Sequence, residues 1–145
     1  MSQNDDKQKQ AEYNNLQRTK TAKQTEYNNA VAFNNQIDEK IRRLKSAYSR
    51  MGLKKENYRN IKKQEKKTID DDYRWKGNNY TIVISQNGGN LKSSDEKYYR
   101  EIDSIQDEIN NEITRLRNMK YSDTFLGNLM RQINNLGTRI RNFFN

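Results

Sequence analysis

The chain has 145 residues, which is enough for one domain. Apolar residues make up 31% of the sequence, well below the usual share, so no thick globular core is expected. Neither cysteine nor histidine is present, which removes disulfides, the cysteine nucleophile, the commonest zinc ligands and the commonest general base. A net charge of +9 with low hydropathy also fits disorder, but the apolar periodicity described next decides against it.

The first helix is expected over residues 8–73, which contain no proline and a single glycine, Gly52. Three polar residues, Asn34, Lys55 and Lys62, fall on its apolar seam, where polar side chains cost stability and specify register. The apolar residues recur in steps of three and four, which is typical of a helix laid against a partner helix: Leu16, Ala30, Ile37, Ile41, Leu44, Tyr48, Met51 and Tyr58.

Residues 74–92 are expected to form a turn and an irregular loop. Trp75 is the sole tryptophan, and Gly77 can adopt the left-handed conformation that ends a helix. Residues 80–85 have the composition of a strand, but a single strand without a partner is not expected. The glycine- and asparagine-rich stretch at 86–90 is a strong breaker of regular structure.

Two further helices are expected, over residues 93–119 and 123–144. Ser93 and Glu96 have the spacing of a capping box at the start of the first of these. The apolar pattern slips in phase near residues 120–124, and Ser122 or Asp123 can cap the next helix. The apolar positions are Tyr98, Ile102, Ile105, Ile109, Ile113, Leu116 and Met119, and then Leu126, Leu129, Ile133, Leu136, Ile140 and Phe143.

We therefore expect one all-α domain over residues 1–145: a long antiparallel helical hairpin, or coiled coil, with a Trp-x-Gly turn and a C-terminal amphipathic helix. Charge supports the antiparallel pairing. Residues 40–67 carry twelve basic and two acidic side chains, whereas residues 93–119 carry four basic and seven acidic ones. Exposed ion pairs steer such a pairing only weakly, at about 0–1 kcal/mol each.

The first helix is longer than the other two together, so part of its seam is expected to remain free. Leftover apolar surface on a long helix predicts a partner helix. The expected partner-binding stripe consists of Tyr27, Ala30, Val31, Phe33, Ile37 and Ile41.

The basic run at residues 54–67 has two interpretations. It could bind the phosphates of nucleic acid or of anionic lipid. On a helix, however, these residues spread around more than half of the circumference, and no nucleic-acid recognition fold is visible. We favour a solvated face with acidic partners, and a nucleic-acid-binding coiled coil or a self-assembling structural coiled coil remain alternatives. Residues 123–144 could likewise lie on a membrane surface, although helix packing fits their pattern better.

No cofactor, metal or catalytic residue is expected. Three consecutive carboxylates, Asp70 to Asp72, diverge by about 100° per residue on a helix and cannot converge on one ion. The N-terminal residues 1–10 lack an apolar core, so they are not a secretory signal peptide, and no segment is long enough to span a membrane.

With its long basic first helix, Trp75-Lys-Gly77 and the stretch from Tyr99 to Ile109, the sequence resembles the WXG-type superfamily of small helical hairpins linked to type VII secretion. More narrowly, it resembles the YwqH-like branch of low-GC Gram-positive bacteria. The resemblance covers most of the chain. It implies a chaperone-like accessory protein that binds the helical N-terminal domain of an LXG-type toxin. The glycine-rich segment at 80–90 and the third helix depart from a minimal hairpin.

The resemblance also bears on location. Tyr99 and Asp103 match the Tyr-x-x-x-Asp/Glu export signal of that superfamily, but the composition produces about one such match by chance. The match also lies at the start of a helix rather than after it. We expect a cytoplasmic protein, with secretion through type VII machinery and without a cleaved signal peptide as the alternative. The expected partner is a protein: a toxin's helical domain, a second small helical protein or another copy of this chain.

Overall fold

The computed structural model describes the backbone of residues 3–76 and 78–145, and the side chains of residues 3–68 and 93–145. Three helices follow one another: α1 (Gln3–Lys76), α2 (Asn78–Met119) and α3 (Asp123–Arg141). No strand occurs within these described residues. The prediction of an all-helical protein with a long first helix and a C-terminal helix is therefore confirmed.

Helix α1 runs without interruption for 74 residues, straight through Gly52. The sequence permits this length because no proline removes a backbone donor along the way. Asp5 and Asp6 lie in the first turn, where negative charge interacts favourably with the helix macrodipole. Most stability of so long a helix still has to come from packing along its seam, because isolated helices are marginal in water.

Helix α2 differs from the sequence-based expectation, because it begins at Asn78 rather than at residue 93. The segment expected as an irregular loop, residues 78–92, is helical, and Ser93 lies inside the helix rather than at a cap. The physical reason is that β-branched residues disfavour a helix by only a few tenths of a kcal/mol, and each glycine by about 1 kcal/mol. Such costs weaken a helix, whereas proline, at about 3 kcal/mol, would have broken it.

Helix α3 has a well-defined start. Ser122 is its N-cap, with extended backbone angles, and its hydroxyl accepts a hydrogen bond of 3.0 Å from the Phe125 amide. Arg139 and Arg141 lie in the last turn, where positive charge is favourable. The helix ends at Asn142, whose amide donates to the Thr138 carbonyl at 3.1 Å.

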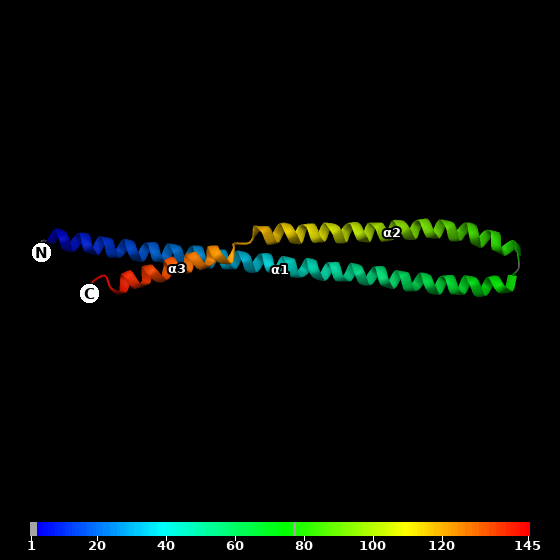
Figure 1. Cartoon of the computed structure of the whole chain (residues 1–145), viewed down its shortest axis with the longest axis horizontal. Helices are drawn as coiled ribbons and strands as arrows, with labels where there is room; N and C mark the ends of the chain where they lie inside the picture. Colours follow the sequence, from blue (N-terminus) through cyan, green and yellow to red (C-terminus); the bar gives the residue numbers. More distant parts are fainter. Residues whose placement is uncertain (1–2, 77) are drawn as a thin grey trace. The chain divides into compact units, whose positions relative to one another are not determined.

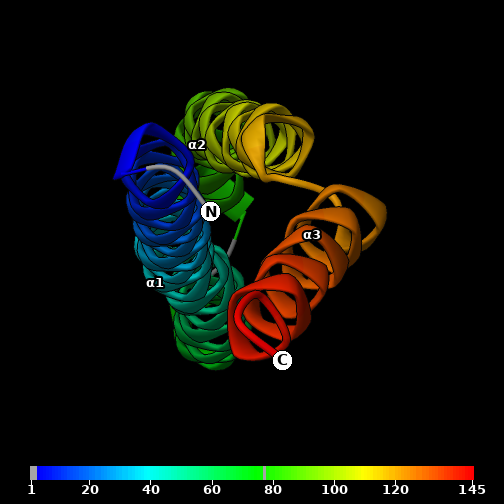
Figure 2. The ribbon, with the colours of Figure 1, turned by 90° about the vertical axis from the view of Figure 1, so that its left-hand side faces the viewer.

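The chain divides into two compact units, both of which draw on α1. Unit 1 comprises Met1–Lys40 and Arg117–Asn145, and unit 2 comprises Ile41–Leu116. Within unit 1, α3 lies against the first half of α1 (Figures 1 and 2). Within unit 2, α2 lies beside the second half of α1 (Figure 1). Each unit is thus a pair of helices around a thin apolar seam.

Candidate functional site

The expected partner-binding stripe lies largely inside unit 1. Ala30 and Ile37 retain only 3% and 2% of their exposed surface. The buried apolar residues of α3 in the same unit are Leu129 and Ile133, each at 4%. Helix α3 therefore covers the first half of α1 in this unit, whereas Asn34 and Asp38, on either side of Ile37, bond Tyr121 and Lys120, which precede α3. Of the remaining stripe residues, Ile41 is buried in unit 2, whereas Tyr27, Val31 and Phe33 are half-buried.

Asn34 holds the start of α3 in place. It is the buried polar residue of the seam, at 8% exposure. Its side-chain Nδ2 donates to the Tyr121 carbonyl at 2.9 Å, and its Oδ1 accepts from the Tyr121 amide at 2.8 Å. Tyr121 lies between α2 and α3, where its backbone groups have no helical partners. We call this two-bond contact the Asn34 latch.

A second contact and an aromatic cluster surround the latch. Lys120 Nζ lies 2.7 Å from Asp38 Oδ1. The ring of Tyr121 stacks on Phe125, with centroids 5.1 Å apart, and meets the ring of Phe33 edge-on at 5.5 Å. Tyr121 and Phe125 remain 43% and 36% exposed. The latch is therefore bordered by apolar surface that the unit itself does not cover.

Aromatic rings connect the chain beyond α3 to α1. The rings of Tyr13, Phe143 and Phe144 contact one another, yet Phe144 stays 62% exposed. Two hollows, of about 550 and 290 Å³, lie between the helices. The first is lined by Gln17, Lys20, Thr21, Gln24, Thr25 and Ile140, and the second by Glu12, Asn15, Leu16, Thr19, Leu136, Arg139 and Phe143.

Unit 2 contains a tyrosine–carboxylate–lysine cluster. Tyr58 on α1 donates a short hydrogen bond to Asp95 on α2, and Lys62 Nζ lies 3.4 Å from the same carboxylate. The bond to Asp95 raises the pKa of Tyr58 above its usual value. Burial lowers the pKa of Lys62, but its bonds to Glu65 and Asp95 outweigh this effect and leave the pKa raised.

The pair matching the export signal is engaged within unit 2. Asp103 accepts a bond of 2.7 Å from Lys55, and the Lys55 ammonium and the Arg59 guanidinium each lie 5.7 Å from the centre of the Tyr99 ring. Asp103 is exposed and Tyr99 is half-buried. Both residues therefore help to join α1 to α2 in this unit.

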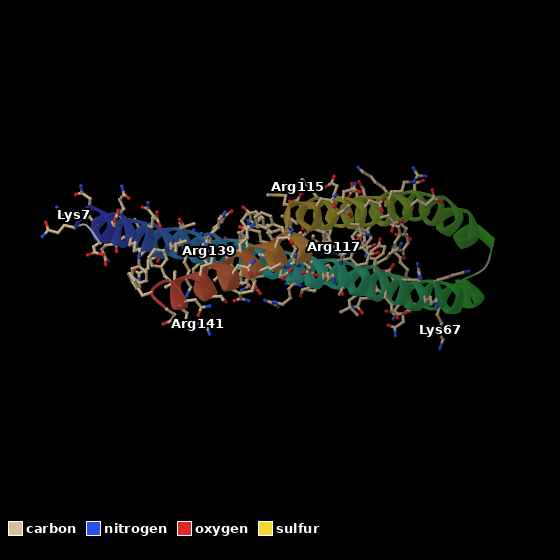
Figure 3. The ribbon with its side chains drawn as sticks, turned by 60° about the vertical axis from the view of Figure 1, so that its left-hand side comes forward. Lys7, Lys67, Arg115, Arg117, Arg139 and Arg141 are labelled. Atoms are coloured by element: carbon tan, nitrogen blue, oxygen red, sulfur yellow. The ribbon has the colours of Figure 1, made fainter. Side chains whose placement is uncertain are left out.

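The basic run on α1 is only partly used in pairing. Lys55 and Lys62 bond carboxylates of α2, so these two seam lysines connect the helices. Lys63, Lys66 and Lys67 are exposed, and Figure 3 shows Lys67 pointing away from α1 on the side opposite α2. The same figure shows Arg139 and Arg141 on α3.

The expected turn motif, Trp75 and Gly77, lies outside the residues whose side chains are described. In the described part of the chain, no group of three or more histidine, cysteine or acidic side chains could hold a metal ion. Nor does any helix in that part have the length and apolar character needed to cross a bilayer.

Sequence reasoning singled out Asn34, Lys55 and Lys62 as polar seam residues. Lys55 and Lys62 each bond a carboxylate of α2, and Asn34 bonds the backbone of Tyr121 between α2 and α3. Sequence reasoning missed the partners of these residues. The break in the apolar repeat near residues 120–124 was the one sequence feature that pointed to Tyr121. No sequence feature paired Tyr58 with Asp95.

Comparison with known proteins gives one positive result. The model of a family described as YwqH-like matches residues 19–138, which include most of α1, all of α2 and most of α3. Searches of curated proteins and of solved structures find no match.

Proposed function

The chain belongs to the YwqH-like family, and on that basis we propose that it is a non-enzymatic, chaperone-type accessory protein. Its partner is the helical N-terminal domain of an LXG-type toxin of a type VII secretion system. Within this proposal the protein acts in the cytoplasm and accompanies the toxin to the secretion machine. The observation that carries the proposal is the family match over residues 19–138.

The structure supports a binding role through its unburied apolar side chains. The exposed set in the described residues includes Leu53 at 58%, Ile61 at 55% and Met119 at 45%. A helix of this kind recognises another helix by placing apolar side chains, spaced three and four residues apart, into a groove. Exposed apolar side chains can in this way cover the apolar helices of a toxin.

Co-purification tests the proposal. The tagged chain is expressed alone and together with the helical N-terminal domain encoded by the adjacent large open reading frame, and the eluate is sized by light scattering. We expect the two chains to elute together at a fixed ratio. Elution of this chain alone as a stable oligomer would favour a structural coiled coil and would contradict the proposal.

A point variant locates the contact. Phe33 is half-buried beside the exposed ring of Tyr121, so Phe33→Asp places a charge on apolar surface next to the latch. We expect it to abolish co-elution with the toxin domain. Asn35→Asp, at the exposed neighbouring position, is the matched control and should leave co-elution intact. Circular dichroism of both variants separates lost binding from lost helix.

A further inference from the structure

The seam that α3 covers on α1 also has the character of a binding site, and this inference rests on the proposed function. We propose that an amphipathic helix of the toxin domain takes the place of α3 on the first half of α1 after the Asn34 latch opens. In the free protein, α3 is the internal occupant of the partner's site.

The chain breaks between α2 and α3 at residues 120–122. Residues 117–123 contain neither glycine nor proline, so nothing in the local backbone forbids a helix there. The Ser122 cap favours the break, and the Asn34 latch satisfies both backbone groups of Tyr121. Much of the break is thus held by a tertiary contact that can be released.

Helix α3 packs on α1 through few fully buried side chains. Only Leu129 and Ile133 of its nineteen residues are buried. Four further apolar side chains of α3 are half-buried: Leu126, Met130, Leu136 and Ile140. A helix with two fully buried anchors, Leu129 and Ile133, is open to competition from a longer partner helix, because affinity depends on well-packed buried anchors.

Two glycines, Gly127 and Gly137, lie inside α3. A Cβ added at Gly127 would meet nothing within 4 Å, and one at Gly137 would come no closer than 3.5 Å to the end of the Lys20 side chain. Packing therefore requires neither glycine, yet each weakens the helix relative to alanine. Such residues keep α3 easy to release, which is the property expected of a displaceable segment.

The chemistry of the seam defines the partner helix. Residues 3–40 carry six basic and six acidic side chains, so charge does not select the occupant. The occupant must present apolar residues in alternating steps of three and four, as α3 does at Leu126, Leu129, Ile133, Leu136 and Ile140. A neutral, apolar, amphipathic helix fits this site, whereas a polyanion does not.

A reversible lock tests the displacement. The chain has no cysteine, so the double variant Asp38→Cys, Lys120→Cys contains a single pair of thiols. A reducible bismaleimide joins these two thiols and holds residue 120, next to the latch, on α1. The matched control is Lys55→Cys with Asp103→Cys, which replaces an ion pair of the same 2.7 Å length in unit 2. We expect the first lock to weaken binding of the toxin domain by at least about 20-fold, with recovery on reduction, and the second to have little effect.

Hydrogen exchange on the unlocked complex supplies an independent readout: amides of α3 should lose protection when the toxin domain binds. If the locked protein binds as tightly as the unlocked one, displacement is wrong and the proposed function stands. If the unlocked chain does not bind the domain at all, the proposed function and the displacement fail together.

A second variant avoids the contact surface altogether. Gly127→Ala strengthens α3 on a side that touches nothing, so we expect the toxin domain to bind about fivefold more weakly, as the helix propensities of the two residues imply. Gly52→Ala makes the same change inside α1 of unit 2 and should leave the affinity unchanged. Equal affinities of both variants and the parent protein would overturn the proposal.

Discussion

At the scale of single residues, Asn34 shows how one buried amide can position a helix. Removing its side chain in Asn34→Ala leaves the amide and carbonyl of Tyr121 without partners in a partly buried site. We expect the free energy of unfolding to fall by about 1–3 kcal/mol, the usual cost of an unsatisfied buried polar group. Urea denaturation followed by circular dichroism measures the change.

The control is Asn35→Ala, which makes the same substitution at the exposed neighbouring position and shares its effect on helix propensity. If the two variants unfold at the same urea concentration, the latch contributes nothing to stability.

Tyr58 gives a prediction about alkaline pH. Because its bond to Asp95 raises its pKa above 10.0, the folded state holds the phenol proton more tightly than the unfolded state does. The stability that this bond supplies is therefore fully present below pH 10 and is lost as the pH rises through the raised pKa. Denaturation of the parent protein and of Tyr58→Phe at several pH values should show a stability difference that shrinks above pH 10. A difference that stays constant into the alkaline range would contradict this account.

At the scale of the element, the start of α3 depends on its cap. Ser122→Ala removes the acceptor of the Phe125 amide, so we expect a loss of about 1 kcal/mol in the free energy of unfolding. Ser122→Asp keeps an acceptor at the same position and should retain most of the stability. Thermal denaturation compares the two, and equal losses would show that capping does not stabilise this helix start.

Helix α2 shows what an element-level pattern can and cannot predict. The strand-like composition of residues 80–85 and the glycines at 88 and 89 indicated a loop, yet the helix runs through them. β-branched residues cost a helix a few tenths of a kcal/mol each and glycines about 1 kcal/mol each, which weakens a helix without forbidding it. Local composition therefore misplaced the start of α2 by fifteen residues.

At the scale of the whole molecule, the net charge of +9 separates two kinds of partner. A protein that binds nucleic acid through six to ten phosphate contacts loses affinity by about 10³–10⁵-fold between 50 and 200 mM salt. Residues 3–40, the described part of α1 in unit 1, carry equal numbers of basic and acidic side chains, so we expect affinity for the toxin domain to change little over the same range. Calorimetry at both salt concentrations, with duplex DNA as the comparison ligand, distinguishes the cases. Steep salt dependence with DNA binding would favour the nucleic-acid alternative.

The sequence by itself determined that this protein is helical, that its first helix is very long and that its last helix is amphipathic. Periodicity and the absence of proline act locally, so they can be read without knowing what packs against what. The sequence also identified the polar seam residues, because a polar side chain in an apolar repeat is visible at once. It even pointed to the family, through residues spread over most of the chain.

Only the tertiary structure decided which surfaces are covered. The sequence predicted that the stripe from Tyr27 to Ile41 would remain free for a partner. In the structure, Ala30 and Ile37 are buried in the unit that contains α3. Burial depends on which helix lies opposite, and that choice rests on contacts between residues far apart in the chain, such as Asn34 with Tyr121 and Tyr58 with Asp95. A repeat of apolar residues shows that a helix will have a partner, but it cannot say whether that partner belongs to the same chain.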